Sequence, residues 1–288
     1  MLAQFLLSGV TMGLTYALAA LGFSIIYNSS GVINFAQGEF IMLGGMATVF
    51  LVGLGLPLPL AIALAVCTAV LAGLLVQKFA IERARNASVV SLIIITIGAS
   101  LVLRGLVQLA LGKESHALKA FSGDTPIAIL GATILPQNLW VMGLSLGVVA
   151  GLSWFFGKTL AGKAMLATSH DRLAANLVGI HTKNILLLAF GLAAALGSFA
   201  GVMVAPLTYT SYDLGVMFGL KGFVAAVLGG LGSSGGAILG GILLGLAEAL
   251  TAGYISSSYK DAMPFVLILF VLFFMPRGLF GAHVTERV

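Results

Sequence analysis

The residues of this chain that could do chemistry gather in a short polar patch between two apolar runs. The patch covers residues 28–39 and ends in two amides and a carboxylate, Asn34, Gln37 and Glu39. Polar groups between apolar segments cost free energy unless they find partners. The patch could therefore line a solute path or a gate. Alternatively it is an interfacial loop, in which Asn34 or Gln37 caps a helix starting near Gly38 and Glu39 lies at the positive end of that helix.

A glycine-rich segment at 229–236 is the second candidate for a solute path, and it lies inside the uncharged run 222–247. A helix broken at membrane depth is tolerated only where it is buried in protein or lines a cavity. Close helix packing would explain the same composition, since small residues recur four apart between 236 and 245. Residues 34–39 and 229–236 could also be counterparts in a weak internal repeat. The candidate pathway residues in this segment are Gly229, Gly230, Gly232 and Ser233.

Two segments resemble catalytic motifs without being complete. Residues 157–164 have the spacing of a phosphate-binding loop, but Ala164 replaces the Ser or Thr that would bind magnesium, and no strand or acidic partner frames the loop. Residues 232–235 resemble the serine motif of intramembrane proteases, which needs a histidine base within the membrane, whereas the only later histidine is His283 in the tail. The chain is therefore expected neither to bind ATP nor to cleave peptides.

The elements that position these residues follow from composition. Of 288 residues, 60% are hydrophobic and 8% are charged, against roughly 25% charged in soluble domains. A transmembrane helix needs about 20 apolar residues. The sequence thus predicts an all-α polytopic membrane protein, a single transmembrane domain over 1–288 with about eight or nine helices. Without a basic segment before it, the first run should be a permanent span. The predicted spans are 5–27, 40–77 crossing twice with a turn at 55–59, 86–103, 137–157, 184–212, 222–247 and 262–276.

The basic residues predict the orientation. Nine of the fourteen Lys and Arg residues lie in three segments that should share the cytoplasmic side. They are Lys78, Arg83, Arg85, Lys158, Lys163, Arg172, Lys183, Arg277 and Arg287. The loop at 112–137, in which Lys113 and Lys119 are offset by Glu114 and Asp124, should then face outward. If the segment at 157–184 and the C-terminal tail are both cytoplasmic, an even number of crossings separates them, and the spans 184–212 and 262–276 already make two. The run 222–247 should therefore return to the side from which it enters, as a hairpin or re-entrant pair. No basic stripe with interleaved aromatics indicates nucleic acid.

The remaining charged residues are expected to have structural roles. Arg104 lies late in its span and is expected to extend toward the outer interface. Lys221, Glu248 and Asp261 are expected to mark the ends of helices. These residues do not form the chain of carboxylates and histidines that a proton relay needs, which argues against a proton-coupled transporter.

The polar island at 157–184 predicts a docking surface for a soluble partner. It carries Lys158, Lys163, Asp171, Arg172 and Lys183 between two long apolar runs. The island is too short to be an enzyme domain and too long to be a simple turn. Since it belongs to the predicted cytoplasmic side, a cytoplasmic protein is the expected partner.

Four segments resemble signatures of one family, the LivH-type permeases of bacterial branched-chain amino-acid ABC transporters. The first is GVINFAQGEF at 31–40 with MLGG at 42–45, and the second is DRLAANLVGI at 171–180. The third is GLKGFVAAVLGG at 219–230, and the tail MPRGLFG at 275–281 fits as well. The resemblance covers essentially the whole chain.

The resemblance implies a subunit of an importer in the bacterial inner membrane. Its partners would be a LivM-like second permease, two cytoplasmic ATPases that are LivG- and LivF-like and use ATP and Mg, a periplasmic binding protein, and membrane lipid. This chain itself would bind no cofactor or metal. Leucine, isoleucine or valine is the implied solute, although related permeases carry urea, short amides or other small solutes. A stand-alone secondary transporter or channel is the alternative from another class.

The resemblance also implies a coupling segment at 158–183. A short helix within it would insert into a cleft of the ATPase and transmit its movement to the spans. The residues implied in this contact are Asp171, Arg172, Ala174, Asn176, Gly179 and Ile180. Gln37 stands where some members of the family carry histidine, so the sequence supports no titrating role at that position.

Overall fold

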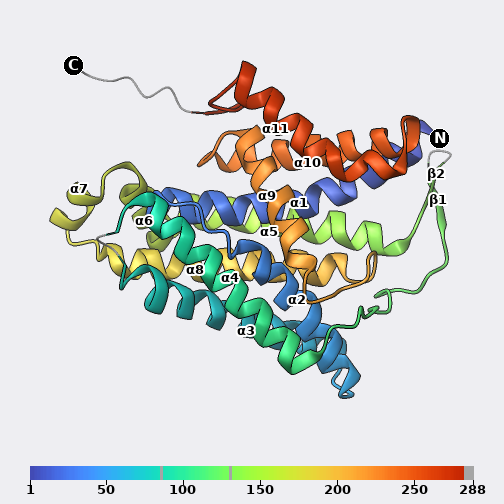
Figure 1. The fold of residues 1–288 in the computed structure, drawn as a ribbon, viewed down its shortest axis with the longest axis horizontal. Helices are drawn as coiled ribbons and strands as arrows, with labels where there is room; N and C mark the ends of the chain where they lie inside the picture. The colour runs from blue at the N-terminus through green and yellow to red at the C-terminus, as the bar shows by residue number, and fades with distance from the viewer. Residues whose placement is uncertain (85–86, 130–131, 282–288) are drawn as a thin grey trace.

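The computed structural model describes residues 1–84, 87–129 and 132–281, so Arg85 and Arg287 lie outside the described residues. The chain forms a bundle of helices with one small antiparallel hairpin at an end (Figure 1). Its first half contains α1 (Leu2–Ser30), α2 (Gln37–Gly53), α3 (Leu58–Leu75), the π-helical turn η1 (Val76–Ile81), α4 (Val89–Leu111), β1 (Ile127–Ile129) and β2 (Ala132–Ile134). Its second half contains α5 (Pro136–Lys158), α6 (Leu160–His170), α7 (Arg172–Leu177), α8 (Thr182–Val204), α9 (Leu214–Gly229), α10 (Ser234–Tyr254), the 3-10 helix η2 (Ser257–Ala262) and α11 (Met263–Phe274).

Among the described residues, seven helical segments are long and apolar enough to span a membrane, and α2 and α9 are shorter apolar helices. The protein is therefore an all-α, multi-pass membrane protein, as predicted. The turn predicted in the run 40–77 lies between α2 and α3, but only α3 with η1 is long enough to span, because α2 is a shorter helix. The predicted span 184–212 was too long, because α8 ends at Val204. Pro206 follows and has no N–H with which to continue the helical hydrogen bonding.

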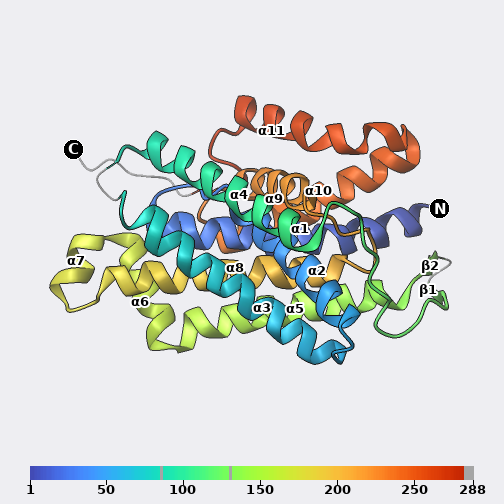
Figure 2. The ribbon, with the colours of Figure 1, turned by 60° about the horizontal axis from the view of Figure 1, so that its bottom comes forward.

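Helix α1 forms the centre of the bundle. It is buried along most of its length and packs against α8, α9 and α10, with α5 alongside. Figure 2 shows α1 and α8 in the middle, α11 on one side and α5 on the other. Close approach to α10 depends on glycine: a Cβ at Gly13 would lie 2.8 Å from the Cα of Ile242. Small residues at such crossings let two backbones approach closely and pack by van der Waals contact.

Two parts of the chain share an order of elements. Helix α1 is followed by the non-helical residues 31–36 and the short helix α2, and α8 is followed by the non-helical residues 205–213 and the short helix α9. Helices α1 and α8 run in opposite directions (Figure 1), and α2 packs against α9. By element order, the counterpart of residues 31–36 is therefore 205–213, and the pairing of 34–39 with 229–236 that the sequence suggested is wrong.

The two ends of the bundle differ. Helices α6 and α7 project from one end, whereas the N-terminus and the β1–β2 hairpin lie at the other (Figure 1). The predicted cytoplasmic segments that the structure describes belong to the α6–α7 end: η1 packs between α3, α4 and α8, and the tail at Gly278 approaches Gly230. The predicted outer loop belongs to the hairpin end.

Candidate functional site

Asn34 closes the turn that leads into α2. Its Oδ1 accepts a hydrogen bond from the backbone N of Ala36 at 3.1 Å, and its Nδ2 has no hydrogen-bond partner. The cap position of α2 is Ala36, so Asn34 forms a turn just ahead of the helix and does not cap it directly. Asn34 is buried, and its free amide is a donor held inside the protein.

Gln37 fixes the start of α2 at mid-length in the bundle. Its Nε2 donates to the carbonyl O of Ala193 at 2.9 Å, and Ala193 lies halfway along α8. The side chain is fully buried, and its Oε1 has no hydrogen-bond partner. Gln37 therefore ties α2 to α8 and does not cap α2.

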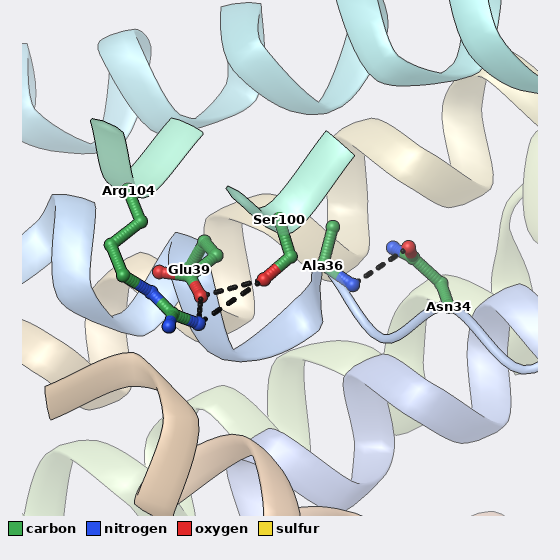
Figure 3. Close-up of polar contacts among 5 residues, drawn as sticks. All are labelled: Asn34, Ala36, Glu39, Ser100 and Arg104. Atoms are coloured by element: carbon green, nitrogen blue, oxygen red, sulfur yellow. Dashed lines mark hydrogen bonds and ion pairs between the residues drawn. The ribbon is translucent and has the colours of Figure 1, made fainter. Parts of the chain in front are cut away.

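Glu39 lies in the first turn of α2 and is paired within the protein (Figure 3). Its Oε1 accepts a hydrogen bond from Ser100 Oγ at 2.8 Å and forms an ion pair with Arg104 Nη2 at 2.7 Å. Ser100 and Arg104 are four apart on α4, so both project from one face toward α2. The expectation that Arg104 reaches the outer interface was wrong. Its side chain is 24% exposed and binds a carboxylate that is 2% exposed.

The first turns of α2 and α9 meet beside this carboxylate. A Cβ at Gly38 would overlap the carbonyl O of Gly215, and one at Gly215 would lie 2.9 Å from Glu39 Oε2. Helix N-termini carry partial positive charge, which favours a carboxylate between them. Glu39 Oε2 has no hydrogen-bond partner. Two short helices thus begin at one carboxylate.

The structure brings Asn34, Gln37 and Glu39 together where the chain enters α2. Each keeps one buried polar atom without a hydrogen-bond partner, respectively Nδ2, Oε1 and Oε2. Two hydroxyls that sequence reasoning missed, those of Ser198 and Thr210, are likewise buried and unpaired within the described residues. Unpaired buried donors and acceptors are uncommon in proteins and need an explanation. A polar solute passing this point would find both kinds of group.

The glycine segment lies elsewhere in the bundle. Helix α9 continues through Gly229, and α10 begins at Ser234, so only residues 230–233 are non-helical. Gly232 has φ +90°, a conformation that favours glycine, and its carbonyl O accepts a hydrogen bond from Asn28 Nδ2 at 2.7 Å. Because Asn28 lies in the last turn of α1, the break is at the α6–α7 end of the bundle. The expectation of a break at membrane depth was therefore wrong.

Packing accounts for the neighbouring glycines. A Cβ at Gly229 would overlap the carbonyl O of Gly236, and one at Gly240 would overlap that of Ala225. Ser233 caps α10, with its Oγ accepting from the N of Gly236 at 3.0 Å. In the described residues no hydrogen bond or ion pair joins the segment with Gly229, Gly230, Gly232 and Ser233 to the cluster at Asn34, Gln37 and Glu39.

The predicted coupling segment forms two short helices, α6 and α7. Asp171 caps α7, because its Oδ1 accepts from the N of Leu173 at 2.8 Å and of Ala174 at 3.0 Å. Gly179 ends the turn with φ +88°, and Ile180 N donates to Ala175 O at 3.0 Å. The six-residue helix α7 is therefore capped at both ends by residues that flank it.

Two polar contacts attach α7 to its surroundings. Arg172 Nη2 donates to the carbonyl O of Ser29 at the end of α1. Asn176 Oδ1 accepts from Thr182 Oγ1 at 3.2 Å, at the start of α8. The large apolar side chains at α7 face away from the bundle: Leu173 and Leu177 in the helix are 78% and 88% exposed, and Val178 directly after it is 76% exposed. Large apolar side chains exposed at a charged end are typical of a docking site.

A second buried charged cluster was missed by sequence reasoning. Lys221 Nζ lies 2.9 Å from Glu248 Oε1 and 2.8 Å from Asp261 Oδ1, and Tyr16 Oη donates to Glu248 Oε2 at 2.7 Å. Lys221 and Glu248 were expected at helix ends, but they are buried within α9 and α10. The sequence carried a signal for this cluster, because Lys221 and Glu248 are ionisable residues next to long apolar runs, and ionisable residues within a membrane are candidates for functional sites. Within the described residues no group of three or more His, Cys, Asp or Glu could hold a metal.

Comparison with known proteins finds similarity over nearly the whole chain. Residues 5–272 match the family described as the permease component of branched-chain amino acid transport systems. The chain is 35% identical to the high-affinity branched-chain amino acid transport permease LivH of Escherichia coli K12, over 99% of this chain and 97% of that protein. It is 34% identical to the corresponding permease BraD of Pseudomonas aeruginosa, with the same coverage.

A solved structure shares the fold. The complex of PsaBC from Streptococcus pneumoniae with a Fab contains a chain that superposes with a TM-score of 0.53, over 96% of this chain and 92% of that one. The two sequences are 15% identical, so the likeness concerns the fold alone.

Proposed function

This chain belongs to the family of permease components of branched-chain amino acid transport systems, and we propose that it is one membrane subunit of an ATP-driven importer. As a permease it is a transport subunit and not an enzyme. Hydrolysis of ATP, with its Mg, takes place in two cytoplasmic ATPase subunits that are LivG- and LivF-like. A LivM-like permease completes the membrane part, a periplasmic protein delivers the solute, and the assembly lies in the bacterial inner membrane.

The observation that supports this proposal best is the exposed apolar surface at α7. Leu173, Leu177 and Val178 form an apolar tip beyond the bundle, on a helix capped at both ends. Its base is fixed to α1 through Arg172 and to α8 through Asn176. A short rigid helix held in this way can carry a push from a soluble subunit into the spans. Asp171, Ala174, Gly179 and Ile180 give that helix its shape, and Arg172 and Asn176 transmit its movement.

The route of that movement leads to the unpaired polar groups. Arg172 holds the carbonyl of Ser29, five residues before Asn34. A displacement of α7 therefore acts on the segment that leads into α2. Alternating access follows if that segment opens toward one side of the membrane and then the other. A zwitterion moving through the bundle meets amides, backbone groups and helix N-termini there.

The proposed solute is leucine, isoleucine or valine. The named functions of LivH and BraD support this solute class. The surroundings of Asn34, Gln37 and Glu39 support it as well, because they hold few unpaired charges that could balance a solute with a net charge. Titration of the cognate periplasmic protein with amino acids, urea and short amides measures the preference. Micromolar or tighter binding of a branched-chain amino acid, with competition by the other two, is expected. Tight binding of urea or an amide alone would reject the solute while sparing the family.

A further inference from the structure

The cluster formed by the buried residues Tyr16, Lys221 and Glu248 and the half-exposed Asp261 borders a cavity of about 290 Å³. The cavity extends from Tyr16, at the middle of α1, to Ser8 and Ala252, nearer the hairpin end. Pockets for small molecules begin at roughly 300 Å³. The space therefore fits one small solute.

The charges of this cluster differ in how firmly they are held. Glu248 is buried, accepts the hydroxyl of Tyr16 and pairs with Lys221. Asp261 also pairs with Lys221, yet 48% of its side chain is exposed. An exposed carboxylate is well hydrated without its partner and its ion pair adds little stability, so the bond between Lys221 and Asp261 is the one that another carboxylate can replace. Glu248 Oε1 is buried and has no hydrogen bond beyond its ion pair.

Apolar side chains line the cavity next to these charges. They are Met12, Met217 and Phe218, with Ala249 and Ala252, while Thr208 and Lys260 add polar groups to the lining. Methionine side chains are flexible and adapt to the shape of an aliphatic group. The cavity is thus lined by a lysine that can bind a carboxylate, by carboxylates that can bind an ammonium group, and by apolar side chains.

We propose that this cavity is a binding site for an α-amino acid with an aliphatic side chain. The carboxylate of the amino acid takes the place of Asp261 at Lys221 Nζ. Its ammonium group binds the released Asp261 and Glu248 Oε1, and its side chain lies on Met12, Met217 and Phe218. The proposal rests on the importer function above and names the groups of this chain that would receive the solute on its way from the hairpin end.

Direct binding tests this site apart from transport. The complete permease–ATPase complex is placed in lipid nanodiscs without the periplasmic protein, and binding of tritiated leucine is measured, with leucinamide and 4-methylpentanoate as competitors. These competitors lack the carboxylate charge and the ammonium group respectively. We expect saturable leucine binding and competition that is about tenfold weaker for each analogue, because each loses one charge-assisted contact.

The variant Lys221→Met separates a ligand contact from a structural role. It should weaken leucine binding about tenfold or more while leaving leucinamide unchanged, because leucinamide does not use Lys221. A general disturbance of the fold would weaken both. Lys78→Met, which removes an exposed lysine at the other end, is the matched control and should bind as the wild type does. Should Lys221→Met not assemble, Met217→Trp fills the cavity without touching the charges and should exclude leucine.

Equal affinity for leucine and leucinamide, or unchanged leucine binding in Lys221→Met or Met217→Trp, would overturn the site. So would the absence of saturable leucine binding up to about 10 mM in the wild type. Import of leucine by the wild-type complex with its periplasmic protein is measured in parallel. Import without binding at this cavity rejects the site alone, whereas import of only a non-amino-acid solute rejects the proposed function.

Discussion

At the residue scale, polar side chains inside the bundle decide what the protein can do. Glu39 is 1% exposed, and a carboxylate at such a position is stable only with a cationic or donor partner. Arg104 and Ser100 supply that partner to one oxygen and leave the other free. The pair links α2, which begins at mid-length, to the full-length helix α4.

Removing Arg104 should therefore cost more than removing the whole pair. Arg104→Met leaves Glu39 buried without its cation and should destabilise the protein by about 3–5 kcal/mol. The double variant Glu39→Gln with Arg104→Met should recover much of this loss, because no buried charge remains. Thermal unfolding in detergent, followed by size-exclusion chromatography after heating, compares the wild type, Arg104→Met, Glu39→Gln and the double variant. Additive losses in the double variant would show that the two side chains do not interact.

At the element scale, the proposed function depends on the short helices α2, α7 and α9. Helices α2 and α9 begin together at Gly38 and Gly215, and α7 is attached to the ends of α1 and α8. These contacts connect the apolar tip at one end with the unpaired polar groups inside. The connection is mechanical, since it consists of hydrogen bonds and close backbone packing.

Breaking that connection should uncouple hydrolysis from transport. Arg172→Glu removes the donor to Ser29, and Gly179→Val forces a β-branched residue into a left-handed conformation that costs about 1–3 kcal/mol. We expect each purified complex to insert and assemble, with import reduced at least tenfold and hydrolysis no longer stimulated by the periplasmic protein. Lys78→Glu, a charge reversal on η1, controls for the change of charge. Normal import with normal stimulation in both variants would remove α7 from the coupling role.

Sequence reasoning predicted the elements better than their contacts. The apolar runs and the turn between α2 and α3 follow from composition and from punctuation by Gly and Pro. The cap at Asp171 and the turn at Gly179 are also local features. By contrast, the partner of Glu39 lies 65 residues away on another helix, and that of Lys221 is set by the crossing of α9 and α10. Tertiary packing alone brings such charges together, and no local pattern in the sequence predicts it.

At the scale of the whole molecule, the account requires a fixed orientation. The basic segments at η1 and α6–α7 belong to one end, and the loop that precedes β1 belongs to the other. Cytoplasmic loops of membrane proteins are enriched in Lys and Arg. The α7 tip should therefore face the cytoplasm, where ATPase subunits would bind, and the cavity near Ser8 and Ala252 should face outward.

Labelling of single cysteines tests this orientation. Cys67, the only cysteine of the chain, is first replaced by serine, and Arg83→Cys, Lys163→Cys and Lys119→Cys are introduced one at a time. An impermeant thiol reagent should label position 119 in spheroplasts, and positions 83 and 163 only after the membrane is permeabilised. Labelling of 163 but not 119 in sealed spheroplasts would reverse the topology and the assignment of α7.

Reconstituted transport shows whether this chain works as a subunit of an ATP-driven importer. Proteoliposomes are made with this chain, its partner permease and both ATPases, with ATP and Mg in the compartment that the ATPases face, and the periplasmic protein with tritiated leucine is added on the opposite side. An ATP-driven importer should accumulate leucine above the external concentration. This accumulation should be lost when ATP, the periplasmic protein or any one subunit is omitted. Accumulation by this chain alone, driven by an ion gradient without ATP, would contradict it and show a secondary transporter instead.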